Sequence, residues 1–282
     1  MERVGIIGGG QMGAGIAEVC AKAGVDVVVR EVTQELAAKG EARIQKSLDR
    51  AVSRGKMEQA DAEAAMGRIR FTTDLGLMAD RELVIEAIVE HEGLKVATFE
   101  ELDGIVGEDT IVASNTSSLP ITRLSAAMSN PSRFLGLHFF NPVPVMALVE
   151  VVETIILAPE VAARAEAFVT DVLGKTVIRS KDRAGFIVNM LLVPYLTEAI
   201  RMYEQGFASA EDIDTGMRLG ANHPMGPLQL CDYIGLDTMK LVADVLFEEF
   251  KSPQYAPPPL LSRMVEAGLL GRKSGRGFYD YS

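Results

Sequence analysis

Short apolar runs alternate with longer amphipathic segments over the first 180 residues of the chain. Residues 3–7 form an apolar run that ends in glycines, and residues 11–23 follow a helical period that stops at Gly24. Residues 25–30 form a second β-rich run, so the order predicts a right-handed βαβ unit and a parallel sheet. The remaining predicted elements are strands at 83–89, 110–114, 134–140, 148–152 and 176–179, and helical segments near 34–66 and 94–104. This pattern indicates a doubly wound α/β sheet, with the last strands able to run antiparallel.

The strand pattern ends at residue 183, and only helical periodicity follows it. Helical stretches are predicted at 186–205, 209–219, 226–249 and 258–268. The polar segment 180–185 separates a predicted strand from a long amphipathic helix and is the expected domain junction. The sequence therefore predicts an α/β domain over 1–183 and an all-helical domain over 184–282.

Composition narrows the class of protein. Lys plus Arg number 28 against 39 Asp plus Glu, a formal charge of -11, so we expect no nucleic-acid partner and no anionic membrane partner. The longest apolar stretch, 186–196, contains Asn189 and Pro194 and falls short of the ~20 residues that cross a bilayer. Cys20 and Cys231 lie far apart in apolar contexts, no metal-ligand cluster is visible, and no export signal precedes residue 3. These features predict a cytoplasmic protein without a metal site.

A glycine-rich motif lies where the first predicted strand meets the first predicted helix. Residues 8–13 read Gly-Gly-Gly-Gln-Met-Gly and match the G-x-G-x-x-G pattern. In that pattern Gly8 makes the tight turn, Gly10 lets the backbone approach a pyrophosphate, and Gly13 allows close helix packing. The motif, with Gln11 and Met12 inside it, predicts a Rossmann-type dinucleotide-binding domain.

The end of the second strand indicates which dinucleotide binds. Glu31 follows Gly13 by 18 residues, close to the spacing at which an acid accepts hydrogen bonds from the adenosine ribose. A carboxylate there also repels a 2'-phosphate, which favours NAD. Arg30 beside it leaves NADP open as the alternative.

One histidine stands out among the three of the chain. Oxidation of a secondary alcohol requires a base near neutrality, and His138 lies at a strand end, where open α/β sheets place ligands. His91 lies in a charged segment and His223 in a turn before proline. Glu150 occupies the middle of an apolar strand, where a buried carboxylate needs a partner. A pair of His138 and Glu150 would fix the imidazole tautomer and stabilise the imidazolium.

Long motifs that cover nearly the whole chain resemble one enzyme family. They are Ser114-Asn-Thr-Ser-Ser-Leu119, Gly136-Leu-His-Phe-Phe-Asn-Pro142, Leu148-Val-Glu-Val-Val152, Gly185-Phe-Ile-Val-Asn189, Leu219-Gly-Ala-Asn-His-Pro-Met-Gly-Pro227 and the closing run 271–279. With the glycine motif before them, these strings resemble the 3-hydroxyacyl-CoA dehydrogenases, and the short form is most similar to 3-hydroxybutyryl-CoA dehydrogenases. The resemblance implies NAD-dependent, reversible oxidation of a 3-hydroxyacyl-CoA at a site between the two domains.

The resemblance also assigns roles to residues of this sequence. It implies that His138 is the acid/base, that Glu150 is its partner, and that Ser117 and Asn189 hold the substrate. Residues that it places in the dinucleotide crevice are Glu90, Lys95, Asn115 and Asn141, and it places Ser47 and Arg54 at the coenzyme A moiety. The family usually has aspartate where this chain has Glu31, which is longer by one methylene.

A helix predicted over 41–54 supports the coenzyme A assignment on charge. Four basic residues share one face, whose centre lies well over a right angle from that of the apolar face: Arg43, Lys46, Arg50 and Arg54. Ser47 lies beside this basic face, and Lys56 extends the strip. A solvated helix face is the alternative interpretation of this strip. A local cationic strip would let a protein of net charge -11 bind an anionic acyl-CoA.

Two other functions remain open from the sequence. One is a dehydrogenase of a free hydroxy acid, and the other is a dinucleotide-binding structural protein without turnover, as some eye-lens relatives of the family are. We also expect a homodimer formed through the helical domain, because the predicted helix 226–249 carries more apolar residues than one face needs.

Overall fold

An eight-stranded sheet organises the N-terminal part of the chain. The computed structural model describes residues 1–282, which divide into one unit from Met1 to Arg183 and another from Ala184 to Ser282. The strand order is β3-β2-β1-β4-β5-β6-β7-β8; β1 to β6 are parallel, β7 is antiparallel to β6, and β8 is parallel to β7. The strands are β1 (Arg3–Ile7), β2 (Asp26–Arg30), β3 (Ile69–Thr72), β4 (Leu83–Glu86), β5 (Ile111–Ser114), β6 (Phe134–Phe139), β7 (Leu148–Glu153) and β8 (Thr176–Lys181). The winding reverses between β1 and β4, and open α/β sheets bind ligands at the carboxyl ends of such strands.

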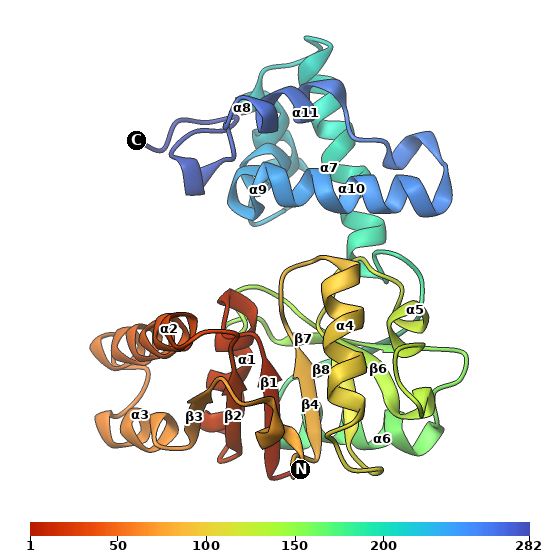
Figure 1. The fold of residues 1–282 in the computed structure, drawn as a ribbon. Helices are drawn as coiled ribbons and strands as arrows, with labels where there is room; N and C mark the ends of the chain where they lie inside the picture. The colour runs from red at the N-terminus through yellow and green to blue at the C-terminus, as the bar shows by residue number, and fades with distance from the viewer. The chain divides into compact units, whose positions relative to one another are not determined.

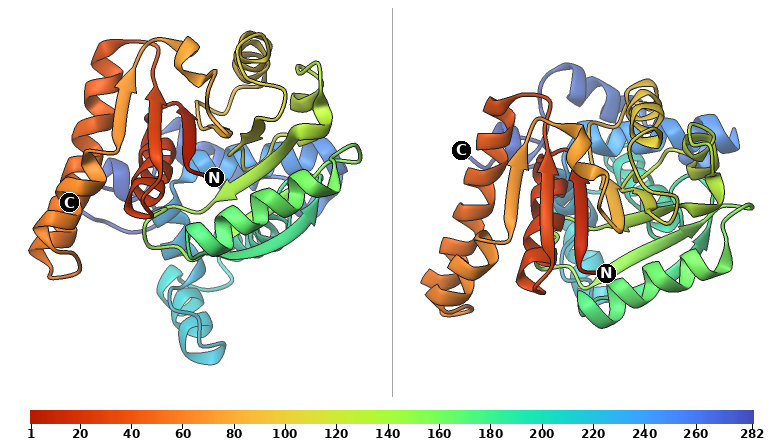
Figure 2. Two further views of the ribbon diagram at one scale, coloured as in Figure 1. Left: turned by 90° about the horizontal axis from the view of Figure 1, so that it is seen from below. Right: turned by 60° about the horizontal axis from the view of Figure 1, so that its bottom comes forward.

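Helices cover both faces of this sheet (Figures 1 and 2). On one face a continuous apolar core joins α1 (Gln11–Lys22), α2 (Gln34–Ser53), α3 (Gln59–Met66) and α6 (Pro159–Ala167) to the strands. On the other face lie α4 (Glu92–Asp103) and α5 (Ile121–Ser125), and Figure 2 shows α4 and α6 on opposite sides. The ring of Phe99 in α4 packs edge-on against Phe134 of β6, with centroids 4.8 Å apart. Because side chains alternate along a strand, His138 of β6 shares the α4 face with Phe134.

The second unit is helical and has its own core. Its helices are α7 (Val188–Glu204), α8 (Ala210–Thr215), α9 (Pro227–Ile234), α10 (Leu236–Phe250) and α11 (Pro259–Glu266). The buried carboxylate of Asp232 accepts hydrogen bonds from the backbone N–H groups of Phe278 and Tyr279, which fastens the closing coil to α9. Short 3₁₀ and π segments complete the chain: η1 (Leu75–Met78), η2 (Pro131–Arg133), η3 (Phe168–Val172), η4 (Gly216–Gly220), η5 (Pro253–Tyr255) and η6 (Arg272–Ser274). None of the helices is long and apolar enough to cross a membrane.

The predicted fold class is confirmed, while several predicted element bounds are wrong. The strand β3 was not predicted because it lies at the sheet edge and its residues are half-buried or exposed, so no continuous apolar run marks it. The helical segment predicted over 34–66 is two helices, separated by a turn in which Gly55 has a φ of 64°. The helix predicted over 226–249 is also two helices, because Gly235, with a φ of 101°, ends α9.

Candidate active site

The glycine motif forms a tight loop between β1 and α1, and its shape fits a dinucleotide pyrophosphate. Gly8 has a φ of 97°, and a Cβ on it would lie 2.8 Å from the carbonyl oxygen of Ala87. A Cβ on Gly13 would lie 1.8 Å from the carbonyl oxygen of Gly8, whereas a Cβ on Gly10 would meet nothing within 4 Å. No side chain caps the N-terminus of α1. The space beside Gly10 and the uncapped helix N-terminus therefore suit an anionic group.

Glu31 lies beside this loop at the end of β2. Its Oε1 accepts a 2.6 Å hydrogen bond from the backbone N–H of Gly9, which holds the carboxylate at the edge of the loop. The Nε atom of the neighbouring Arg30 is buried and has no hydrogen-bond partner. Arg43 of α2 reaches the same loop, because its Nη1 donates to the carbonyl oxygen of Gly9 at 3.0 Å. Arg43 was predicted from the sequence to lie on the cationic strip of α2, and its contact with the glycine loop was not predicted.

His138 and Glu150 face each other across β6 and β7. The two residues are directly paired in the antiparallel register, and His138 Nδ1 lies 2.6 Å from Glu150 Oε2. Glu150 is fully buried and His138 is 5% exposed. The ring of Phe140 packs against the imidazole with centroids 4.5 Å apart. The short contact to Glu150 and the ring of Phe140 hold the imidazole at the carboxyl end of β6.

This geometry selects one tautomer of His138. A carboxylate only accepts hydrogen bonds. In the neutral imidazole, Nδ1 therefore carries the hydrogen, and this N–H group donates a hydrogen bond to Glu150. Nε2 then holds the lone pair and can accept a proton. Proton uptake at Nε2 produces an imidazolium beside a buried carboxylate, which stabilises the charge.

The other histidines have local contacts of a different kind. His91 is exposed and caps the N-terminus of α4, where its Nδ1 accepts a hydrogen bond from the backbone N–H of Leu94. His223, in the second unit, lies with Nδ1 3.1 Å from the hydroxyl of Tyr195. Nowhere do three or more His, Cys, Asp and Glu side chains gather in a way that could hold a metal ion.

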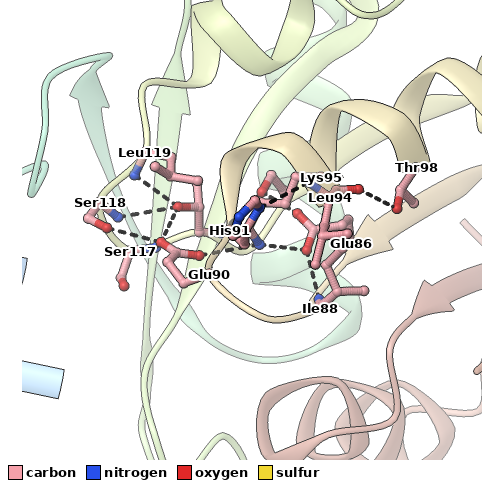
Figure 3. Close-up of polar contacts among 12 residues, drawn as sticks. Glu86, Ile88, Glu90, His91, Leu94, Lys95, Thr98, Ser117, Ser118 and Leu119 are labelled. Atoms are coloured by element: carbon pink, nitrogen blue, oxygen red, sulfur yellow. Dashed lines mark hydrogen bonds and ion pairs between the residues drawn. The ribbon is translucent and has the colours of Figure 1, made fainter. Parts of the chain in front are cut away.

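A buried polar cluster joins β4, β5 and α4 (Figure 3). Lys95 is 1% exposed, and its ammonium lies 2.6 Å from Oε1 of Glu86 and 3.3 Å from Oε2 of Glu90. Glu90 Oε1 accepts hydrogen bonds from the backbone N–H of Ser117 at 3.1 Å and from the Ser118 hydroxyl at 3.0 Å. Burial would raise the pKa of Glu90, but the Lys95 ammonium and the hydroxyl donors outweigh it, so this pKa lies below its ordinary value.

Comparison with known proteins identifies the chain. Residues 3–183 match the NAD-binding domain of 3-hydroxyacyl-CoA dehydrogenase, and residues 185–281 match its C-terminal domain. The chain belongs to the 3-hydroxyacyl-CoA dehydrogenase family. It is an NAD-dependent dehydrogenase, and the glycine loop and Glu31 lie in the domain that carries the NAD-binding match.

Relatives are similar over the full length of this dehydrogenase. A Mycobacterium tuberculosis protein named 3-hydroxybutyryl-CoA dehydrogenase is 58% identical over 282 residues, covering 100% of this chain and 99% of the relative. The human mitochondrial hydroxyacyl-coenzyme A dehydrogenase is 46% identical over 288 residues, with 100% and 91% covered. The crystal structure of FadB2 from M. tuberculosis superposes with a TM-score of 0.99 at 58% identity, covering 100% and 99%. That of the (S)-3-hydroxybutyryl-CoA dehydrogenase PaaH1 from Ralstonia eutropha has a TM-score of 0.95 at 48% identity and the same coverage.

The other residues predicted to bind the dinucleotide make hydrogen bonds or packing contacts within the first unit. Gln11 Nε2 donates a 2.9 Å hydrogen bond to Oδ1 of Asn141, which joins the glycine loop to the segment after β6. Met12 packs on the core of the sheet. Asn115 is buried, and its Oδ1 accepts a hydrogen bond from the backbone N–H of Phe139 at 2.9 Å. Lys95 binds two carboxylates of its own domain, as described above.

The predicted coenzyme A residues of the dehydrogenase fall partly on one cavity. A cavity of about 360 Å³ lies between α1, α2 and the segment after β6, and Lys46, Ser47 and Arg50 line it with Asn141. Arg54 is the C-cap of α2 and Lys56 follows it; both are exposed and neither lines the cavity. Asn189 lies in the first turn of α7, in the second unit.

Glu86 and Ser114 are polar residues of the cluster that were not predicted as site residues from the sequence. Glu86 ends the apolar run of β4 and is fully buried, as Glu150 is in β7. Glu86, like Glu150, is a carboxylate in an apolar strand, and this feature of the sequence already indicates a buried acid that needs a partner.

Proposed function

We propose that this dehydrogenase catalyses the reversible oxidation of (S)-3-hydroxybutyryl-CoA to acetoacetyl-CoA, with His138 as the acid/base. The observation that carries the proposal is the buried 2.6 Å contact between His138 and Glu150, at the same end of the sheet as the glycine loop. The printed names of full-length relatives support the choice of the four-carbon acyl group.

Each residue of the site has a separate role in the proposed reaction. Bound NAD supplies the acceptor for the hydride that leaves the substrate carbon. His138 Nε2 takes the hydroxyl proton, and Glu150 holds Nδ1–H and stabilises the imidazolium that results. Ser117 hydrogen-bonds the reacting oxygen, and Asn189 steadies the acyl group. In the reverse direction the His138 imidazolium returns its proton to the oxygen of the ketone.

The coenzyme A moiety is assigned to the cationic strip of α2. Ser47 and Arg50 border the 360 Å³ cavity, and Arg54 and Lys56 continue the positive charge beyond it. Exposed basic side chains attract the coenzyme A phosphates over about a Debye length, ~10 Å at 0.1 M salt. This local charge supports a thioester substrate over a free hydroxy acid.

Initial rates test the proposal directly. Acetoacetyl-CoA, longer 3-ketoacyl-CoAs and free acetoacetate should each be offered with NADH and with NADPH. We expect the highest kcat/KM for acetoacetyl-CoA with NADH, and a loss of about 10²- to 10⁴-fold in kcat for His138→Gln with little change in NADH affinity. Faster turnover of free acetoacetate would identify the alternative substrate class, and a near-normal kcat for His138→Gln would refute the acid/base assignment.

A homodimer formed by the second unit is the second part of the proposal. The apolar residues that suggested a dimer from the sequence mostly lie in the core: Leu228, Leu236 and Leu246 are buried. The support comes from α7 and α8, which border an apolar cavity of about 550 Å³ lined by Tyr195, Met202 and Met217. Phe207, which precedes the cavity-lining Ala208, is 76% exposed. A two-fold contact would let one copy cover the apolar cavity of the other.

Light scattering at micromolar concentration tests the dimer. The wild-type chain should have twice the 30.4 kDa monomer mass, and Phe207→Asp should lower the mass towards that of a monomer. Ile155→Asp, which changes an exposed apolar residue of the first unit, is the matched control and should keep the dimer mass. A monomeric wild-type chain would overturn this part.

A reducing compartment, the cytoplasm, suits the two cysteines. Cys20 and Cys231 are free and buried, and burial raises the pKa of the Cys20 thiol to about 12. Cell fractionation with a tagged chain tests this location, and recovery from an exported fraction would contradict it.

A further inference from the structure

One buried acid of the cluster has no role in the proposed reaction. Glu86 is fully buried at the end of β4, next to β1 in the sheet. Its Oε1 accepts hydrogen bonds from the backbone N–H of Ile88 at 2.7 Å and from the Lys95 ammonium at 2.6 Å. Its Oε2 accepts from the Ser114 hydroxyl at 2.6 Å. Complete burial of a carboxylate costs free energy unless hydrogen-bond donors and a cation surround it. The three donors to Glu86 therefore stabilise its charged form.

The partner of Glu86 is shared with a second carboxylate. The Lys95 ammonium lies 2.6 Å from a carboxylate oxygen of Glu86 and 3.3 Å from one of Glu90, so it forms an ion pair with both acids (Figure 3). The closer contact to Glu86 holds the ammonium at a fixed distance from Glu90. Removal of the charge on Glu86 would leave Glu90 as the only counter-ion of Lys95 and draw these two groups together.

Glu90 in turn holds the segment that follows β5. The hydroxyls of Thr116 and Ser118 and the backbone N–H of Ser117 all donate to the same oxygen, Oε1. The other side of the segment is fixed by Asn115, whose Oδ1 accepts from Phe139 N–H, one residue after His138. The position of Ser117 relative to His138 therefore depends on where the carboxylate of Glu90 lies.

We propose that Glu86 is a positioning residue of the dehydrogenase: through Lys95 and Glu90 it sets the position of Ser117 against His138. Glu86 touches neither substrate nor cofactor in this role. The inference rests on the proposed role of Ser117 at the reacting oxygen. Misplacement of a reacting group by about 1 Å can cost about 10²-fold in rate, so a small shift of Glu90 is enough to matter.

Glu86→Gln tests the inference, because the amide keeps the shape and removes the charge. We expect kcat for acetoacetyl-CoA reduction to fall about 10- to 100-fold, less than the 10²- to 10³-fold typical for loss of a whole oxyanion donor. KM for acetoacetyl-CoA should change by less than about threefold, because the contact to the reacting oxygen strengthens in the transition state. Asp103→Asn is the matched control: it is an acid at the far end of α4 that binds Arg133 and Ser129, and its kcat should stay at the wild-type value.

A double-mutant cycle separates positioning from general damage to the fold. In a Ser117→Ala background, Glu86→Gln should cost almost nothing further in kcat, because the group that it positions is gone. An equal loss in both backgrounds would overturn the proposal, as would a wild-type kcat for Glu86→Gln. If Glu86→Gln does not fold, Ser114→Ala removes the donor to Glu86 Oε2 and also the acceptor of the Thr116 N–H. It should show a smaller loss that also disappears in the Ser117→Ala background.

Hydrogen exchange gives a readout that does not need turnover. In the full-length protein, a peptide that covers residues 115–119 should exchange faster in Glu86→Gln than in the wild type, while a peptide over β8 should not change. Unchanged protection of 115–119 would overturn the inference. Failure of the proposed function is distinguishable, because it would appear as absent wild-type turnover of acetoacetyl-CoA, whatever the exchange result.

Discussion

Replacement of Glu150 by glutamine removes the buried charge beside His138 while it preserves the volume of the side chain. The 2.6 Å contact and the complete burial of Glu150 make this a charge-assisted hydrogen bond of about 1.5–3 kcal/mol. At about 1.4 kcal/mol per tenfold change, its loss from the transition state corresponds to about 10- to 150-fold in kcat. This value applies if the glutamine amide accepts from Nδ1 and so preserves the tautomer.

The amide can also bind in the opposite orientation. Its NH₂ group would then donate to Nδ1 of His138 and force the proton onto Nε2, the atom that should act as the base. The corresponding acid-to-amide change in a Ser-His-Asp triad costs about 10⁴-fold for this reason. We therefore expect a loss between about 10- and 10⁴-fold, and values near the upper limit would indicate the inverted tautomer.

Stopped-flow or steady-state rates with acetoacetyl-CoA and NADH from pH 5 to 10 provide the assay. Because a neutral partner stabilises the imidazolium less, the pH–rate profile should also move to lower pH in Glu150→Gln. Glu153→Gln is the matched control: it lies on the same strand, and its partners Arg179 and Lys181 are exposed. A Glu150→Gln enzyme with near-normal kcat and an unmoved profile would refute the pairing mechanism.

Three further perturbations test other parts of the site. Glu31→Ala should raise KM for NADH and raise the ratio of NADPH to NADH use, measured by initial rates, because an acceptor for the ribose and a charge that repels a 2'-phosphate are both lost; an unchanged ratio would contradict this position for the ribose. Arg50→Glu with Arg54→Glu should raise KM for acetoacetyl-CoA and flatten its salt dependence while KM for NADH stays constant, and Arg263→Glu in the second unit is the control; equal losses for both substrates would indicate structural damage. The lowered pKa of Glu90 contributes stability that is fully present above its unfolded value, about 4.3, and is lost as pH falls through the folded value. Thermal unfolding between pH 3 and 7 should therefore show a shallower acid-side decrease in Tm for Glu90→Gln, and parallel curves would contradict this coupling.

Local sequence predicted the parts of the fold that depend on local patterns. The glycine motif, the apolar run before it and the amphipathic segment after it place β1, α1 and β2 within a residue or two of the observed bounds. The edge strand β3 could not be found this way, because its residues are half-buried or exposed and it is defined by its pairing with β2. The helix break at Gly235 could not be predicted from local sequence either. A Cβ at this position would meet the side chains of Asp237 and Lys273, and Lys273 is far away in the sequence.

The pairing of His138 with Glu150 shows what residue types alone cannot supply. The sequence contains a histidine at a strand end and a carboxylate in an apolar strand, and each suggests a partner. Whether they meet depends on the direction of β7, because only the antiparallel register with β6 puts residue 138 opposite residue 150. That reversal is a property of the whole sheet, in which β7 and β8 run against the six parallel strands.

The ion-pair partners of Lys95 also could not be predicted from its position in the sequence motif. The family pattern places this lysine in the dinucleotide crevice, where a cation would be expected to face an anionic ligand. In the structure its ammonium lies between Glu86, the last residue of β4, and Glu90, in the connection from β4 to α4, and only 1% of the residue is exposed. Two acids share one cation, and Glu90 also accepts a hydrogen bond from the backbone N–H of Ser117. Because Glu86 contacts Lys95, Lys95 contacts Glu90 and Glu90 contacts Ser117, we expect a change of charge at Glu86 to alter the position of Ser117.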